Sequence, residues 1–73
     1  MNATGSLTIH VNDRPREVGE GRRLADLMTE LGLADRKGVA AAVNGAVVPR
    51  GGWPATTLAA GDRVLVIQAT QGG

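Results

Sequence analysis

Two glycines, Gly72 and Gly73, stand at the end of the sequence, a few residues after an apolar stretch. Glycine loses more conformational freedom on folding than other residues, so a folded body gains little stability from such a pair. The pair therefore indicates either chemistry at the terminal group or a chance Gly-rich end. Because the chain contains 11 glycines, the pair alone does not distinguish these two readings.

Side chains that could do chemistry elsewhere in the chain are sparse. His10 is the only histidine, and it falls on the polar side of an alternating stretch with no paired carboxylate in register, which favours a solvated surface role. The segment Gly19–Gly21 begins like a dinucleotide fingerprint, but Leu24 stands where the third glycine is needed. A phosphate loop requires a Ser or Thr after its glycine and lysine, and none follows Gly38. We therefore predict that the chain is not an enzyme.

Composition narrows the function further. With 73 residues the chain is expected to be a single domain, 1–73, whose apolar residues are nearly all needed for one core. One aromatic residue and a net charge of +1 argue against nucleic-acid binding. No cysteine is present, which excludes a disulfide scaffold and a thiolate nucleophile. Without a secretory signal or an apolar run of membrane-spanning length, we expect a cytoplasmic protein that does not associate with membranes.

The hydrophobic periodicity predicts five strands and one helix, an α+β protein in which one helix covers one face of one sheet. The strands alternate apolar and polar residues or form short apolar runs between turn residues. In chain order, the predicted elements are strand 7–12, strand 16–18, helix 24–31, strand 39–44, strand 46–48 and strand 63–68. Asn44-Gly45 predicts a type I′ hairpin turn, Pro49 ends the fourth strand, and 50–57 is expected to be irregular.

The helix should span about three turns, with its apolar residues on one side. These are Leu24, Leu27, Met28 and Leu31. Gly32 is expected to end it, with Leu33 folding back on the last turn as in a Schellman motif. Arg22 and Arg23 stand where a capping side chain would suit the helix dipole, so the helix should begin in a frayed or charge-compensated way.

The last strand has more apolar residues than one helix can cover. Val64, Leu65, Val66 and Ile67 do not alternate with polar residues, a pattern typical of a strand covered on both faces. If Val64 and Val66 face the helix, Leu65 and Ile67 lie on the other face. Together with the small Ala40 and Ala42 of a neighbouring strand, they would form an exposed patch beside the tail. The patch is either a docking face or ordinary apolar surface.

The second half of the sequence resembles the ThiS family, the sulfur carrier proteins of thiamine biosynthesis. The matching features are Val43-Asn44-Gly45, Val48-Pro49-Arg50, Trp53, the Leu58…Gly61-Asp62 turn, the apolar last strand and Gly72-Gly73. The resemblance is strong after Val39 and loose before it. One departure is Arg23, at a helix cap where many members have Thr, and it concerns the start of the helix and not the tail.

The resemblance implies a β-grasp, ubiquitin-like fold with a five-stranded mixed sheet and a flexible C-terminal tail, 69–73. It also implies that the α-carboxylate of Gly73 is the functional group, which a partner enzyme adenylates with ATP and which a persulfide then converts to a thiocarboxylate. Gln71 and Gly72 would thread into the partner, because glycine presents a carbonyl without a side chain in the way. No permanently bound cofactor or metal is expected.

The implied partners are an adenylating enzyme of the E1-like type, a sulfur donor system such as a cysteine desulfurase, and thiazole synthase. We expect Leu65 and Ile67, and more weakly Arg50, to form the surface that docks on them. Three alternatives stay open at this point. The chain could be the small subunit of molybdopterin synthase, a protein-tagging modifier, or a non-covalent ubiquitin-like interaction module whose glycines are incidental.

Overall fold

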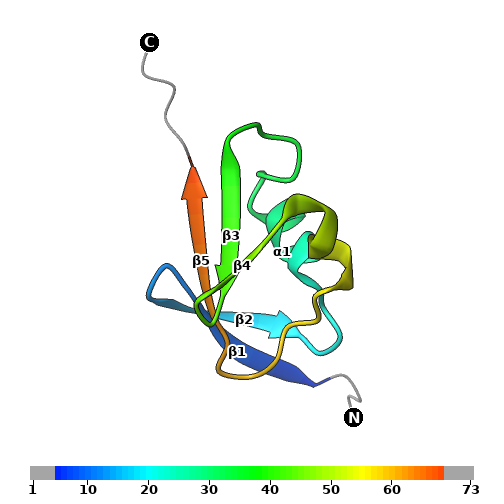
Figure 1. Ribbon diagram of the computed structural model, residues 1–73. Helices are drawn as coiled ribbons and strands as arrows, with labels where there is room; N and C mark the ends of the chain where they lie inside the picture. The colour runs from blue at the N-terminus through cyan, green and yellow to red at the C-terminus, as the bar shows by residue number, and fades with distance from the viewer. Residues whose placement is uncertain (1–4, 69–73) are drawn as a thin grey trace.

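The computed structural model describes residues 5–68, which form the five strands and the helix that the periodicity predicts, together with one 3₁₀-helix (Figure 1). The elements are β1 (Ser6–Val11), β2 (Arg14–Gly19), α1 (Leu24–Glu30), β3 (Val39–Val43), β4 (Ala46–Val48), η1 (Arg50–Ala55) and β5 (Arg63–Gln68). The α+β class is therefore confirmed. The predicted tail, 69–73, lies outside the described residues.

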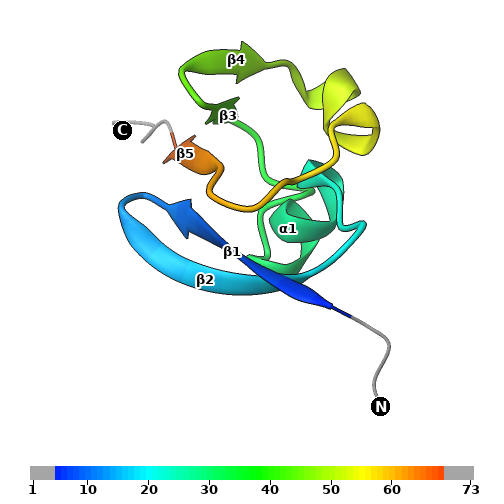
Figure 2. The same ribbon diagram turned by 90° about the horizontal axis from the view of Figure 1, so that it is seen from below.

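The strands form one mixed sheet in the order β2-β1-β5-β3-β4, so the last strand of the sequence is the central strand of the sheet. β5 runs parallel to β1 and antiparallel to β3, and each outer strand is joined to its neighbour by a hairpin. Figure 2 shows α1 on one side of the curved sheet. The opposite side, which we call the outer face, is covered by no helix of residues 5–68 (Figure 2).

The core lies between α1 and the inner side of the sheet. Its largest fully buried side chains are Ile9, Leu24, Leu27, Met28 and Val64. Trp53 and Leu58, from the segment that connects β4 to β5, are also buried and belong to the same cluster. Because the helix contributes three of the five fully buried side chains, its apolar stripe supplies much of the packing energy of this small domain.

Helix α1 is shorter than expected, with seven residues in place of about three turns. It ends because Gly32 adopts a positive φ of 75°. The Leu33 N–H then donates to the Met28 carbonyl at 2.9 Å and the Gly32 N–H to the Thr29 carbonyl at 3.0 Å. This pair of bonds confirms the Schellman motif, with Leu33 buried against the core.

The helix begins in the charge-compensated way that the two arginines predict. The Asp26 carboxylate accepts a hydrogen bond from the Arg23 N–H at 2.9 Å, so an acidic residue in the first turn faces the positive end of the helix dipole. The Leu24 N–H donates to the Thr56 carbonyl at 2.8 Å. The start of the helix is thus tied to the segment that follows η1.

Both hairpins turn on two residues with positive φ. Asn44 (52°) and Gly45 (85°) confirm the predicted type I′ turn, and Asn12 (52°) and Asp13 (70°) form a second one. Because the Asn12-Asp13 turn is tight, β2 begins at Arg14, and the strand predicted around residues 16–18 is too short. Pro15 is tolerated within β2 because β2 is an edge strand of the sheet.

The prediction that 50–57 is irregular is wrong over Arg50–Ala55, which form the 3₁₀-helix η1. It starts after Pro49, as the Gly52 N–H donates to the Pro49 carbonyl at 2.7 Å, and the Thr56 hydroxyl donates to the Gly52 carbonyl at 2.9 Å. The indole N–H of Trp53 donates to the Val48 carbonyl at 3.0 Å. Local turn bonds and the buried indole together shape a segment that carries no apolar periodicity.

Candidate functional site

The expected reactive residues, Gly72 and Gly73, and the neighbouring Gln71 lie outside the described residues. The described part shows how the strand that leads to them is held. β5 ends at Gln68 and pairs with β3 from Val64 to Gln68, whereas its register with β1 stops at Val64. The strand therefore passes the β1–β2 turn before the last residues begin (Figure 1).

Along β5, alternate side chains point to opposite sides of the sheet. Val64 is 2% exposed and faces the core, whereas Leu65 and Ile67 are each 50% exposed on the outer face. On β3, Ala42 lies opposite Leu65 and Ala40 opposite Ile67. The exposure expected for Leu65 and Ile67 is confirmed, and their role in docking stays a prediction.

Val47 extends this apolar surface and was missed in the sequence. It is 74% exposed, and in the β3–β4 pair it lies opposite Ala42. Leu65, Ala42 and Val47 therefore lie side by side on three adjacent strands. The signal was present in the Asn44-Gly45 turn, because a two-residue turn fixes the register and thereby places Val47 on the same face as Ala42. We call Val47, Leu65 and Ile67 the apolar row.

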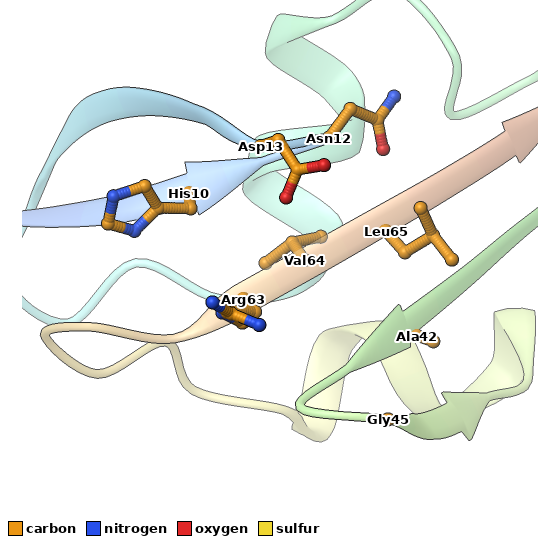
Figure 3. A pocket seen from close by; sticks show the side chains of 8 residues that line it. All are labelled: His10, Asn12, Asp13, Ala42, Gly45, Arg63, Val64 and Leu65. Atoms are coloured by element: carbon orange, nitrogen blue, oxygen red, sulfur yellow. The ribbon is translucent and has the colours of Figure 1, made fainter.

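A pocket of about 170 Å³ lies on the outer face and is lined in part by Leu65 of the apolar row (Figure 3). Its residues come from the β1–β2 hairpin, β5, β3 and the β3–β4 turn: His10, Asn12, Asp13, Ala42, Gly45, Arg63, Val64 and Leu65. Figure 3 shows His10 and Ala42 at opposite ends. Polar tips from His10, Asp13 and Arg63 thus stand beside an apolar wall, an arrangement that suits contact with another protein's side chains.

His10 is exposed, as the alternation predicts, and lies beside Arg63 in the parallel register of β1 and β5. Within residues 5–68, no group of three or more His, Cys, Asp or Glu side chains could hold a metal ion. No helix of the described part is long and apolar enough to cross a membrane.

Arg50, the third expected docking residue, makes contacts within the chain. Its guanidinium donates to the main-chain carbonyls of Ala34 and Arg36 and lies 4.7 Å from the centre of the Trp53 ring. These contacts join the loop after α1 to η1, on the side of the molecule that carries the helix. The structure thus gives Arg50 a role in holding this loop, and its part in docking stays a prediction.

Comparison with known proteins agrees with the observed fold and with the family that the sequence resembles. A model of the ThiS family matches residues 9–73. A search of curated proteins returns no significant match. The crystal structure of a thiamine biosynthesis protein (ThiS) from Geobacter metallireducens is similar with a TM-score of 0.77 and 30% sequence identity, over 92% of this chain and 100% of that chain.

An NMR solution structure of a thiamine biosynthesis protein from the same organism gives a TM-score of 0.75 at 30% identity, over 92% of this chain and 88% of that chain. These likenesses confirm the β-grasp arrangement that the resemblance implies. The family match spans all five strands beyond the first residues of β1, and it reaches the terminal glycine pair. The chain therefore belongs to the ThiS family.

Proposed function

We propose that this ThiS-family chain is a sulfur carrier in thiamine biosynthesis, and that its reactive group is the α-carboxyl of Gly73. The observation that carries the proposal is the extent of the family match, which includes Gly72 and Gly73 as well as the folded body. The similar structures are thiamine biosynthesis proteins, and no feature of the described residues favours a molybdopterin carrier, a protein-tagging modifier or a non-covalent module over them.

The proposed chemistry begins with a carboxylate that is ionised at neutral pH and is a poor acyl donor. A carboxylate oxygen of Gly73 attacks the α-phosphorus of ATP in the partner enzyme, and pyrophosphate leaves. A persulfide sulfur then displaces AMP from the acyl adenylate to give an acyl disulfide. A thiol reduces this disulfide, which leaves the thiocarboxylate on Gly73. ATP thus belongs to the partner, and the carrier needs no cofactor of its own.

This chain contributes position and access to that chemistry. β5 is the central strand of the sheet and Val64 is buried in the core, so the strand that leads to the tail is held by the folded body. Gln71 and Gly72 bring the reacting carbonyl into the partner, and glycine lets it approach without a steric clash. The carrier is in this proposal a substrate of enzymes and not itself an enzyme.

The apolar row is the proposed docking surface for the adenylating enzyme, and for thiazole synthase when the sulfur is delivered. Two of its three residues, Leu65 and Ile67, lie on β5, the strand that leads to the tail, so a partner seated on them has the terminal residues within reach. Leu65 and Ile67 contribute apolar area that docking would bury, and His10 and Arg63 contribute a polar border. Arg50 lies elsewhere and would contact only a partner that also reaches the loop after α1.

The test is the intact mass of the chain after incubation with the organism's ThiS-adenylating enzyme, ATP, a cysteine desulfurase with cysteine, and a thiol. The proposal predicts a mass increase equal to the exchange of one oxygen for sulfur. Reactions without ATP, or with a chain that lacks Gly73, serve as controls and should show no increase. An unchanged mass in the complete reaction, with a chain shown to be folded, would contradict the proposal.

A further inference from the structure

The side chain of Asn12, in the β1–β2 turn, pairs with the main chain of β5 although the two are 54 residues apart. Its Oδ1 accepts a hydrogen bond from the Val66 N–H at 2.8 Å, and its Nδ2 donates to the Val66 carbonyl at 3.3 Å. One side-chain amide thus satisfies both main-chain groups of a single strand residue. Figure 3 shows the side chain of Asn12 beside β5.

These two bonds continue the ladder between β1 and β5 beyond its regular end. The main-chain N–H of His10 donates to Asp62 and that of Asn12 to Val64, each at 2.9 Å. In a parallel ladder, the next bonds would join the Val66 N–H to a carbonyl of β1 and the Val66 carbonyl to an N–H two residues further along β1. Asn12 has a positive φ of 52°, which turns the chain into the hairpin, and its side chain supplies both partners.

The other edge of β5 is already paired. The Asn44 N–H donates to the Arg63 carbonyl at 2.8 Å, so Arg63 bonds toward β3. Because such bonds alternate in an antiparallel pair, Leu65 and Ile67 also bond toward β3, whereas Val66 and Gln68 point toward β1. Within residues 5–68, Val66 is therefore the last residue of β5 whose main-chain groups on the β1 side have a hydrogen-bond partner. Gln68 is the next residue whose main-chain groups point that way.

We propose that Asn12 is a positioning residue that sets where the sheet ends and the reactive tail begins. By closing the open edge at Val66, its amide holds the end of β5 in line, so that the residues after Gln68 leave from one fixed point. Without the amide, Val66–Gln68 would be held by β3 alone. A partner enzyme would then have to order a longer segment before Gly73 reached its site, at a cost in conformational entropy. The part of this inference that concerns activation rests on the proposed function.

The test compares Asn12→Gly with a matched control, Asn44→Gly. Glycine adopts a positive φ without strain, so each variant keeps its type I′ turn and loses only a side-chain amide. The amide of Asn44 bonds the Arg63 N–H at 3.0 Å and Asp62 Oδ1 at 2.9 Å. The control therefore removes two comparable bonds at the start of β5, far from the tail. Asn12→Asp keeps an acceptor for the Val66 N–H and loses the donor.

Two measurements are made on the full chain. In hydrogen exchange followed by NMR, Asn12→Gly should speed exchange of the Val66 amide about tenfold relative to the Ile67 amide, as expected for losing one or two exposed hydrogen bonds. Asn44→Gly should leave that ratio unchanged.

In adenylation assays with carrier concentration varied, kcat/KM for Asn12→Gly should fall about tenfold, mostly through KM, because about one more residue must be ordered. The kcat/KM of Asn12→Asp should lie between those of Asn12→Gly and Asn44→Gly.

The inference is overturned if Asn12→Gly keeps kcat/KM within about twofold of the unmodified chain, or if Asn44→Gly loses as much. An unchanged Val66 exchange ratio would also overturn it, because the amide would then not hold the strand end. If the unmodified chain is not adenylated at all, the proposed function fails, and the exchange ratio still decides whether Asn12 ends the sheet.

Discussion

Replacing Leu65 with aspartate should weaken binding to the adenylating enzyme about 30-fold. Leu65 keeps half of its surface exposed, and burying that half on docking contributes about 1 kcal/mol, from ~1.5–3 kcal/mol for a whole leucine side chain. A carboxylate placed in the same contact adds a desolvation penalty of at least about 1 kcal/mol. The sum of about 2 kcal/mol corresponds to a ~30-fold higher Kd.

The assay is isothermal titration calorimetry of the carrier with its adenylating enzyme. The position is on the surface of a strand, so the fold should lose only about 1 kcal/mol, within the span of strand propensities, and a thermal melt checks this. Ala55→Asp is the matched control, because it adds the same charge at an exposed position on η1. Its Kd should stay within about twofold of the unmodified chain.

A second variant, Leu65→Ala, removes apolar area without adding charge and should raise Kd about fivefold. Leu65 has no part in docking if Leu65→Asp, shown to be folded, binds as tightly as the unmodified chain. The apolar row is also not responsible if Ala55→Asp weakens binding as much, because the effect would then arise from net charge.

Three further predictions concern the tail, the core and the loop after α1. One residue added after Gly73 should abolish the mass increase on activation and leave the thermal midpoint unchanged, because the extended chain ends in the wrong carboxylate; full activation of the extended chain would contradict this. Met28→Ala should cost about 2–5 kcal/mol in urea unfolding, since Met28 is fully buried between α1 and the sheet, and a loss below about 1 kcal/mol would contradict the packing. Arg50→Gln should lower Tm by about 4–8 °C, the effect of ~1 kcal/mol in a domain of this size, because it removes two bonds to carbonyls and the contact with Trp53; an unchanged Tm would show that these contacts contribute nothing.

Features encoded over a few neighbouring residues could be predicted from the sequence. The Asn44-Gly45 turn, the Schellman motif at Gly32 and the exposure of Leu65 each follow from local spacing and from the conformational preferences of the residues involved. The helix was predicted too long because Leu31 continues the apolar stripe although its main chain already leaves the helix as the C-cap.

Features that depend on distant parts of the chain could not be predicted. The 3₁₀-helix η1 has no apolar periodicity, and it is shaped by the burial of Trp53 and by the bonds of Arg50 to a loop about 15 residues earlier. Asn12 carries the signature of a turn residue, but its bonds to Val66 exist only because the parallel pairing of β1 and β5 brings the two together. Such contacts arise from the topology of the sheet and leave no local signal.

The most direct test of the central claim is to locate the sulfur within the activated chain. After incubation with the adenylating enzyme, ATP and the sulfur source, tandem mass spectrometry of the C-terminal peptide reports which residue has exchanged oxygen for sulfur. We predict that fragments containing Gly73 carry the added mass and that all others have their ordinary mass. Sulfur on any other residue, or a C-terminal peptide of unchanged mass, would contradict it.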